Sequence, residues 1–237
     1  ATVDNLRRMD RQQVDLGLVT TNVSYHAYVG EQAFEGKKVD NRLMFVYSPA
    51  PQNVVVRGDA KVSSLAELAG KRFNPGLKGS ATEKTAEAVF KTLGIAPDWV
   101  RGSTTDIVNS IKDNRVIGYV KSGAGNKLDG SSLDIATFTP VKVLGLSADQ
   151  KKLLQDKMPD IAVVDIPAGA ADGIPAYSTW SFGLAVSARP DLSEEMAYQI
   201  AKAVFEDTTV QVGALTSLKG IDIMKLTLEQ GTIPLHP

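Results

Sequence analysis

Apolar and polar positions along this chain alternate between strand-like and helix-like patterns. Short apolar runs predict strands, and apolar residues spaced three and four positions apart predict helices. The expected strands cover residues 15–19, 43–47, 54–57, 71–74, 116–120, 141–146 and 182–186. Pro49-Ala50-Pro51 is expected to separate the second strand from the third. This alternation predicts an α/β fold with mainly parallel sheets.

Helix start signals accompany the pattern. Ser64 with Glu67, and Ser147 with Gln150, have the spacing of capping boxes, in which a hydroxyl and a longer polar side chain bond each other's backbone amides. Residues 166–177 are rich in Pro, Gly and Ala and predict a loop. The last well-marked helix is expected on an apolar stripe formed by Met196, Ala197, Ile200, Ala203 and Val204.

The most informative stretch is Gly79-Ser80-Ala81-Thr82-Glu83. Ser80 is predicted as an N-cap with Glu83 completing a capping box, and Gly94 is placed for a left-handed C′ position. The first amides of such a helix lack intrahelical acceptors, and the helix dipole adds roughly half a positive charge, so an anion is a natural occupant. The alternative is a cap that satisfies its own donors and binds nothing. From this motif alone both interpretations stay open.

Three strands are expected to end in loops of small or hydroxyl residues. The loops are 20–22, 79–82 and 122–125. Ligands of open α/β sheets lie beyond the carboxyl ends of the strands, and short side chains let backbone amides approach a small polar ligand. Together the three loops predict a ligand site.

The composition excludes several classes of protein. The 237 residues carry 26 basic and 27 acidic side chains, a formal net charge of −1, so there is no basic excess for nucleic acid. There is no cysteine, which excludes disulfides and thiolate chemistry. His26 and His236 have no ligand-spaced companions, so neither a metal nor another cofactor is expected. No apolar run approaches the ~20 residues of a membrane span, and no signal peptide is recognised, so no membrane insertion is expected.

Several short motifs follow one another in a fixed order over nearly the whole chain. They lie at residues 4–6, 14–19, 54–57, 64–72, 79–86, 166–169 and 234–237. In this order they resemble the TAXI class of solute receptors of TRAP transporters, the tripartite ATP-independent periplasmic systems. The sequence GSATE at 79–83 stands where that family has GSGTE, and PLHP at 234–237 resembles the family's closing PLHPGA motif.

The chain also departs from the family pattern. Ala81 replaces the middle glycine of GSGTE, and Ala170 stands where the family has a Thr-Tyr pair. Asn114 and Ile117 replace a glycine and an aspartate of another family motif. The family's opening strand and first helix would precede residue 1, so the first lobe is expected to lack its N-terminal part.

The resemblance implies a type II periplasmic-binding-protein fold with two α/β lobes and a ligand cleft between them. Lobe I would comprise residues 1–58 plus 179–237, and lobe II residues 59–178. The chain would be a periplasmic receptor, expected as a monomer, that partners with the membrane permease subunits of a TRAP transporter. It would bind a small carboxylate, such as an amino acid, oxo acid or dicarboxylate, without catalysis.

The resemblance and the loops together give a set of expected ligand-binding residues. They are Thr20, Thr21, Tyr25, Tyr47, Ser80, Ala81, Thr82, Ser122, Gly123 and Trp180. For Trp180 a core position is the commoner role, and Tyr25 is equally compatible with a structural role. Arg57 could pair with a second carboxylate, but a surface position is favoured.

Two other functions remain as alternatives. The same fold serves as the ligand-sensing domain of transcription regulators, which would require a helix-turn-helix region upstream of residue 1. An enzyme on the same scaffold is the third possibility. No Ser-His-Asp set can be assembled around His26, and no spacing selects a carboxylate pair, so catalysis is not expected.

Overall fold

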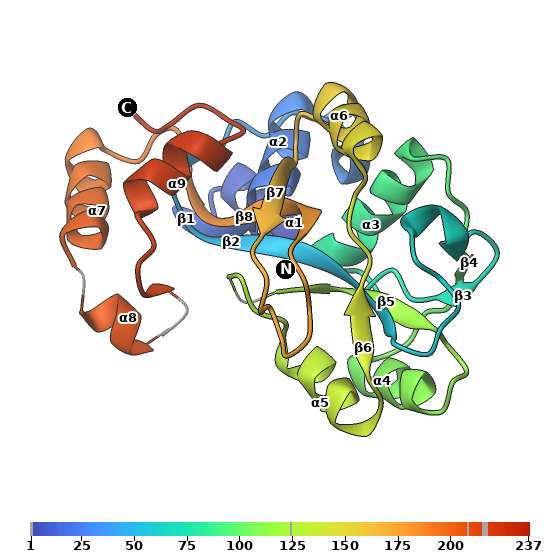
Figure 1. The fold of residues 1–237 in the computed structure, drawn as a ribbon. Helices are drawn as coiled ribbons and strands as arrows, with labels where there is room; N and C mark the ends of the chain where they lie inside the picture. The colour runs from blue at the N-terminus through green and yellow to red at the C-terminus, as the bar shows by residue number, and fades with distance from the viewer. Residues whose placement is uncertain (1, 124, 208, 215–217) are drawn as a thin grey trace. The chain divides into compact units, whose positions relative to one another are not determined.

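The computed structural model describes residues 2–123, 125–207, 209–214 and 218–237, and the chain divides into two compact units (Figure 1). Unit 1 comprises Ala1–Ala50, Asp160–Ala162 and Phe182–Pro237. Unit 2 comprises Pro51–Pro159 and Val163–Ser181. The long strands β2 (Arg42–Arg57) and β8 (Tyr177–Ala188) each contribute residues to both units. The lobe limits expected from the resemblance stay a prediction.

Unit 1 is built around the antiparallel pair of β1 and β8, in which Leu16 lies opposite Ala188 and Thr20 opposite Leu184. In chain order its elements are α1 (Thr2–Asp10), β1 (Leu16–Thr20), α2 (Thr21–Val29), η1 (Gln32–Phe34), the first part of β2, the last part of β8, α7 (Glu194–Glu206), α8 (Val210–Ala214) and α9 (Ile223–Gln230). Helix α1 packs on β1 and α2. One apolar cluster of this unit contains Leu6, Met9, Val19, Ala27, Phe34, Leu43 and Val46.

Unit 2 has a mixed sheet with helices around it (Figure 1). Its elements are the end of β2, η2 (Leu65–Leu68), β3 (Arg72–Phe73), α3 (Ala81–Thr92), β4 (Asp98–Trp99), α4 (Thr104–Lys112), β5 (Gly118–Ser122), α5 (Gly130–Phe138), β6 (Val141–Val143), α6 (Ala148–Lys157), all but the first residue of β7 (Ala162–Ile166) and the start of β8. Strand β2 pairs antiparallel with both β5 and β6.

The strands that lead into the two polar loops of unit 2 run in the same direction. Strand β3 pairs parallel with β4, and a parallel bridge joins Asn74, just after β3, to Tyr119 in β5. The loop after β3 and Ser122 at the end of β5 therefore lie at the same edge of the sheet. The interior of unit 2 has an aliphatic cluster that includes Val55, Ile107, Ile111 and Ile135, and an aromatic cluster of Phe73, Phe90, Trp99 and Trp180.

Two expectations about the sheets are wrong. Residues 42–57 form one continuous strand instead of two runs divided at Pro49-Ala50-Pro51. Two prolines two positions apart remove donors from only one edge of a strand, and their fixed φ is compatible with extended backbone, so the strand continues. The expected parallel sheets are mixed, because β2 enters antiparallel to β5 and β6, and β1 antiparallel to β8.

Helix expectations are mostly confirmed. The Ser147–Gln150 capping box is present, and Gly94 has a positive φ of 69°. The Ser64–Glu67 pair does not open an α-helix, because Ser64 makes no side-chain cap bond and Glu67 instead accepts from the amide of Ser63. That hydrogen bond lowers the pKa of Glu67. Met196, expected on an apolar stripe, is 52 % exposed.

Candidate functional site at the start of helix α3

Helix α3 begins as the sequence predicts. The Ser80 side chain accepts a hydrogen bond from the amide of Glu83 at 3.1 Å, which confirms Ser80 as the N-cap. The return bond of the predicted capping box is different: Glu83 Oε2 accepts from the amide of Gly79, at 2.6 Å, instead of the amide of Ser80. Glu83 therefore ties the loop before the helix to its first turn.

The Glu83 carboxylate is buried, and its charge is balanced by a neighbour. Arg101 donates from Nε to Glu83 Oε1 at 2.9 Å and also pairs with Glu87. Both hydrogen bonds raise the pKa of Arg101. Because an arginine compensates this acidic side chain, Glu83 does not cancel the positive end of the helix.

Two donors at this helix start have no acceptor in the part of the chain that the structure describes. Ser80 accepts from the third amide of the helix, whereas the amides of Ala81 and Thr82 have no hydrogen-bond acceptor among the described residues. Both residues are partly exposed. The cap therefore satisfies the third amide of the first turn and leaves the first two amides available.

The turn before the helix is held close to it. Asn74 accepts from the amide of Gly76 at 2.9 Å and donates from Nδ2 to the carbonyl of Val100 at 2.8 Å. Gly76 has a φ of +125°, and a Cβ there would lie 2.8 Å from Thr82 Cγ2 and 3.0 Å from the amide nitrogen of Glu83. Only glycine fits this conformation and this close approach.

The polar loop after β5 contacts the α3 start. Ser122 Oγ lies 3.1 Å from Thr82 Oγ1 and accepts from Gln52 Nε2 at 2.8 Å. Two of the three predicted loops therefore meet within unit 2. The amide of Gly123, the other residue expected from this loop, is already bonded to the carbonyl of Pro51 at 2.7 Å.

A tyrosine that sequence reasoning did not select lies beside this network. Tyr177 donates to Asn53 Oδ1 at 2.7 Å, and burial raises the pKa of Tyr177 to about 12. Asn53 Nδ2 would lie 2.7 Å from a Cβ at Gly123, so Asn53 packs directly against the loop after β5. The predicted loop at 166–177 ends at Tyr177, but no local pattern indicates that its side chain pairs with a residue 124 positions earlier.

The expected residues of unit 1 cluster at the start of α2. Thr20 is the N-cap with an extended backbone, but its side chain makes no cap bond. Its Oγ1 is buried and has no hydrogen-bond partner among the described residues. Thr21 Oγ1 accepts from the amide of Gly183 at 2.8 Å, and the Thr21 carbonyl accepts from Thr232 Oγ1 at 2.6 Å. Thr21 therefore fastens the helix to the rest of its unit.

The two expected tyrosines of unit 1 are partly buried. Tyr25 lies edge-on to His26 with ring centroids 6.1 Å apart, and His26 Nε2 lies 3.1 Å from Asp160. Burial raises the pKa of Tyr47. Their expected role as ligand contacts stays a prediction.

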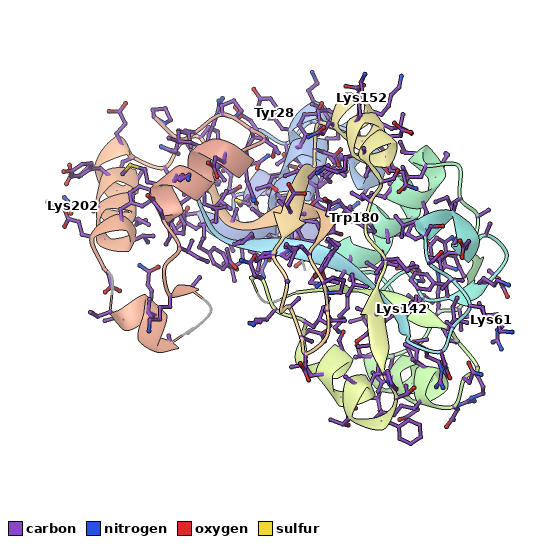
Figure 2. The ribbon with its side chains drawn as sticks, viewed as in Figure 1. Tyr28, Lys61, Lys142, Lys152, Trp180 and Lys202 are labelled. Carbon is purple, nitrogen blue, oxygen red and sulfur yellow. The ribbon has the colours of Figure 1, made fainter. Side chains whose placement is uncertain are left out.

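Trp180 and Arg57 are enclosed within unit 2. Trp180, labelled in Figure 2, is fully buried. It packs edge-on to Phe90 with ring centroids 6.3 Å apart, which is the core position considered for it from the sequence. The surface position favoured for Arg57 is wrong, since it is only 8 % exposed. Its guanidinium donates to Asp59 and to the carbonyls of Ile111 and Lys112 at the end of α4, and the pairing lowers the pKa of Asp59.

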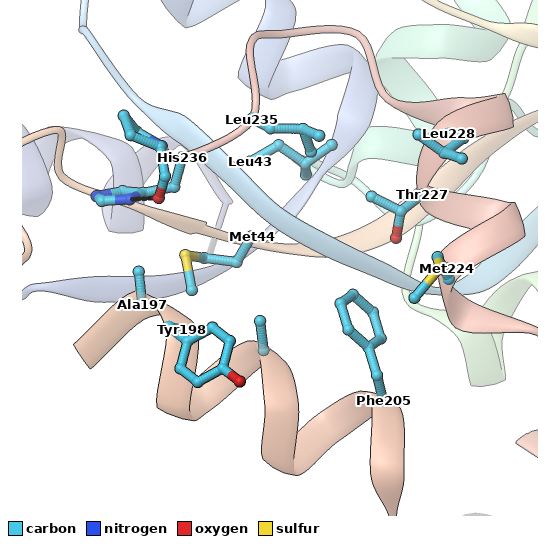
Figure 3. A pocket seen from close by; sticks show the side chains of 12 residues that line it. Leu43, Met44, Ala197, Tyr198, Phe205, Met224, Thr227, Leu228, Leu235 and His236 are labelled. Atoms are coloured by element: carbon cyan, nitrogen blue, oxygen red, sulfur yellow. Dashed lines mark hydrogen bonds between the residues drawn. The ribbon is translucent and has the colours of Figure 1, made fainter. Parts of the chain in front are cut away.

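Two hollows are lined by residues outside the α3 start. A hollow of about 290 Å³ in unit 1 has mostly apolar walls, among them Met44, Phe205 and Met224 (Figure 3). A hollow of about 260 Å³ in unit 2 is lined by Asp59, Lys61 and Lys71, and Lys61 projects outward at the edge of the unit (Figure 2).

The ranges 2–123, 125–207, 209–214 and 218–237 contain no group of three or more His, Cys, Asp or Glu side chains placed to hold a metal ion. Within the same ranges, every helix is too short or too polar to span a lipid bilayer. The arrangement at α3 thus has backbone amides and hydroxyls as its available groups, and these suit the binding of an anion.

Comparison with known proteins identifies the family. A model of the NMT1-like family matches residues 1–237. Among solved structures, a TctC solute binding protein from Polaromonas has a TM-score of 0.51 at 13 % identity, covering 92 % of this chain and 68 % of that one. An ancestral arginine-binding protein has a TM-score of 0.48 at 16 % identity, covering 97 % and 77 %. The aliphatic sulphonate binding protein SsuA from Escherichia coli has a TM-score of 0.46 at 13 % identity, covering 98 % and 63 %.

At 13 % identity the likeness to the TctC solute binding protein concerns the mixed α/β fold alone. The match of the family model to the whole chain shows that this protein belongs to the NMT1-like family.

Proposed function

We propose that this protein is the extracytoplasmic receptor of a TRAP-type transporter, close to the TAXI class, and that it binds a small carboxylate without converting it. The observation that carries the proposal is the half-open start of α3. The amides of Ala81 and Thr82 have no acceptor among the described residues, and the Thr82 and Ser122 hydroxyls lie beside each other at the same place.

A carboxylate at this position would accept charge-assisted hydrogen bonds. Such bonds contribute about 1.5–3 kcal/mol each, so two amides suffice to orient a small solute. Arg101 supports this use, because it compensates Glu83 and leaves the positive helix end available to a second anion. The partners would be the membrane permease subunits of the transporter, on the periplasmic side.

The absence of catalysis is part of the same proposal. Glu83, in the first turn of α3, is bonded to Arg101, and His26 lies against Asp160 in unit 1. The open groups at α3 are therefore amides and hydroxyls, which bind and orient a solute but do not transfer protons near neutral pH.

Removing one amide donor without disturbing the helix tests the proposal. Ala81 is the first residue of α3, where proline is well tolerated, and Ser80 before it has the extended backbone that a following proline requires. Ala81→Pro thus deletes the Ala81 N–H. Thr104→Pro is the matched control, because Thr104 is the first residue of α4 and follows Ser103, another extended N-cap.

Isothermal titration with glutamate, 2-oxoglutarate and succinate is the measurement. We expect the wild type and Thr104→Pro to bind the same member of this panel, and Ala81→Pro to bind it about 10-fold or more weakly. A folded wild type that binds none of the three acids contradicts the proposal. Equal affinities of Ala81→Pro and Thr104→Pro would show that the carboxylate is not held by α3.

A further inference from the structure

We propose that the hollow of about 260 Å³ in unit 2 is a binding site for a phosphate group, either as free phosphate or as part of a small phosphate ester. All the residues that line this hollow lie outside the start of α3. The inference therefore goes beyond the proposed function and does not depend on it.

The hollow lies at the amino ends of two strands of unit 2. Lys71 directly precedes β3, Ile117 directly precedes β5, and both residues line the hollow. The amide of Ile117 donates to the carbonyl of Arg72 at 3.0 Å, which holds the two strand starts together. The start of α3 follows the carboxyl end of β3. A phosphate group in the hollow would therefore not compete with a carboxylate at α3.

Two lysines give the hollow positive charge that no neighbour compensates. Neither Lys61 nor Lys71 forms an ion pair within the parts of the chain that the structure describes. The Asp59 carboxylate in the same wall is already paired, because Arg57 donates to both of its oxygens, at 2.8 and 2.7 Å. The charges of this pair cancel, so the two lysines remain as a local excess in a chain whose net charge is −1.

This excess suits a phosphate group better than a single carboxylate. A phosphate ester carries a charge of about −1.5 to −2 near neutral pH, which matches two ammonium groups, and lysine binds phosphate as a point charge. Lys61 extends from the edge of the unit (Figure 2), and its flexible four-carbon chain can turn toward a bound anion. The volume is a little below the range of about 300–1,000 Å³ for drug-sized ligands, which leaves room for a small organic group.

The wall that carries Lys61 is held in place before any ligand binds. Lys142 Nζ donates to the carbonyl of Ala60 at 2.7 Å. Arg57, only 8 % exposed, bonds two carbonyls at the end of α4 in addition to Asp59. The backbone amide of Lys61 has no acceptor among the described residues. This ordered wall keeps the entropic cost of binding low and adds an amide donor.

The experiment titrates the protein with inorganic phosphate, glycerol 3-phosphate and acetate at low salt and near neutral pH. Backbone amide chemical shifts measure both the affinity and the place of binding. One variant combines Lys61→Gln with Lys71→Gln, and a second combines Lys61→Arg with Lys71→Arg, which keeps both charges. The matched control combines Lys152→Gln with Lys202→Gln, two exposed lysines outside the hollow (Figure 2) that remove the same charge.

We expect both phosphate compounds to shift the amides of residues 59–62 and 71, and acetate to bind about 10-fold or more weakly. The glutamine pair should weaken phosphate binding about 10-fold or more, whereas the arginine pair and the control pair retain it. Tighter binding of glycerol 3-phosphate than of phosphate would identify an ester as the ligand, and equal binding would identify the phosphate group alone.

Four results would overturn the inference. They are the absence of shifts at residues 59–62 and 71, acetate binding as tight as that of phosphate, equal losses in the glutamine pair and the control pair, and loss of phosphate binding in Ala81→Pro. The third result would show a general attraction to the positive surface, and the fourth would place the phosphate at α3. None of them bears on carboxylate binding, because the glutamine pair should bind the carboxylate panel as the wild type does.

Discussion

Helices α2 and α3 start from the same local plan but begin in different ways. Each follows a strand and opens with small hydroxyl residues. At α3 the N-cap hydroxyl of Ser80 bonds the third amide, and a buried glutamate fastens the preceding loop. At α2 the N-cap hydroxyl of Thr20 bonds nothing in the described chain, and the next residue, Thr21, fastens the helix to a distant strand.

The comparison shows that the hydrogen bonds that hold a helix start in place can come from other groups than the donors that the same helix start leaves available. At α3 the cap and the restraint come from the local segment 76–83, and the amides of Ala81 and Thr82 stay open. At α2 the restraint is long-range, through Gly183, and the cap position itself stays open. The same composition therefore gives two helix starts that expose different donors.

The largest predicted effect comes from breaking the local restraint at α3. Gly76→Ala would place a methyl group 3.0 Å from the Glu83 amide nitrogen at a φ of +125°, so the turn must shift. Strain and overpacking together should lower the free energy of unfolding by about 3 kcal/mol. Both tryptophans, Trp99 and Trp180, lie in unit 2, so denaturant unfolding followed by tryptophan fluorescence reports this unit.

Gly79→Ala is the matched control for that measurement. Gly79 also has a positive φ, 77°, but a Cβ there would meet nothing within 4 Å. Only the conformational cost of about 1 kcal/mol is expected. Equal losses in both variants would mean that the contact between the turn and the helix start contributes nothing.

The α3 start could be predicted from sequence because its determinants are local. Ser80 and Glu83 are three residues apart, and this spacing alone indicates the cap. The meeting of Thr82 with Ser122 followed from the rule that loops after neighbouring parallel strands share one edge. The partner of the Glu83 return bond differed by one residue, a detail that depends on the turn held by Asn74.

The α2 start could not be predicted in the same way. The sequence at 20–22 predicts only a polar loop, and the bonding of Thr21 depends on Gly183, 162 residues away. Long-range pairing likewise decided that β2 continues through Pro49 and Pro51, and that Arg57 is enclosed at the end of α4. Local patterns contain no information on these contacts.

The second predicted effect concerns the distant restraint on α2. Thr21→Val removes the acceptor of the buried Gly183 amide, and leaving such a donor unsatisfied should cost about 2 kcal/mol. Thr82→Val, at a partly exposed hydroxyl of α3, should cost less than about 1 kcal/mol. Thermal unfolding gives the total effect, and hydrogen exchange of peptides from unit 1 locates it for Thr21→Val. A larger fall of the melting temperature in Thr82→Val than in Thr21→Val would contradict the prediction that the long-range bond of Thr21 is the stronger restraint.

The smallest effect distinguishes the two caps. Ser80→Ala deletes the bond to the Glu83 amide and should destabilise the protein by about 1 kcal/mol, the usual value of an N-cap. Thr20→Val has no cap bond to lose and removes a buried unpaired hydroxyl, so the free energy of unfolding should stay equal or rise. Urea unfolding of both variants without solute checks the pair. Equal destabilisation would mean that Thr20 caps α2 in solution, and the contrast between an open and a closed helix start would disappear.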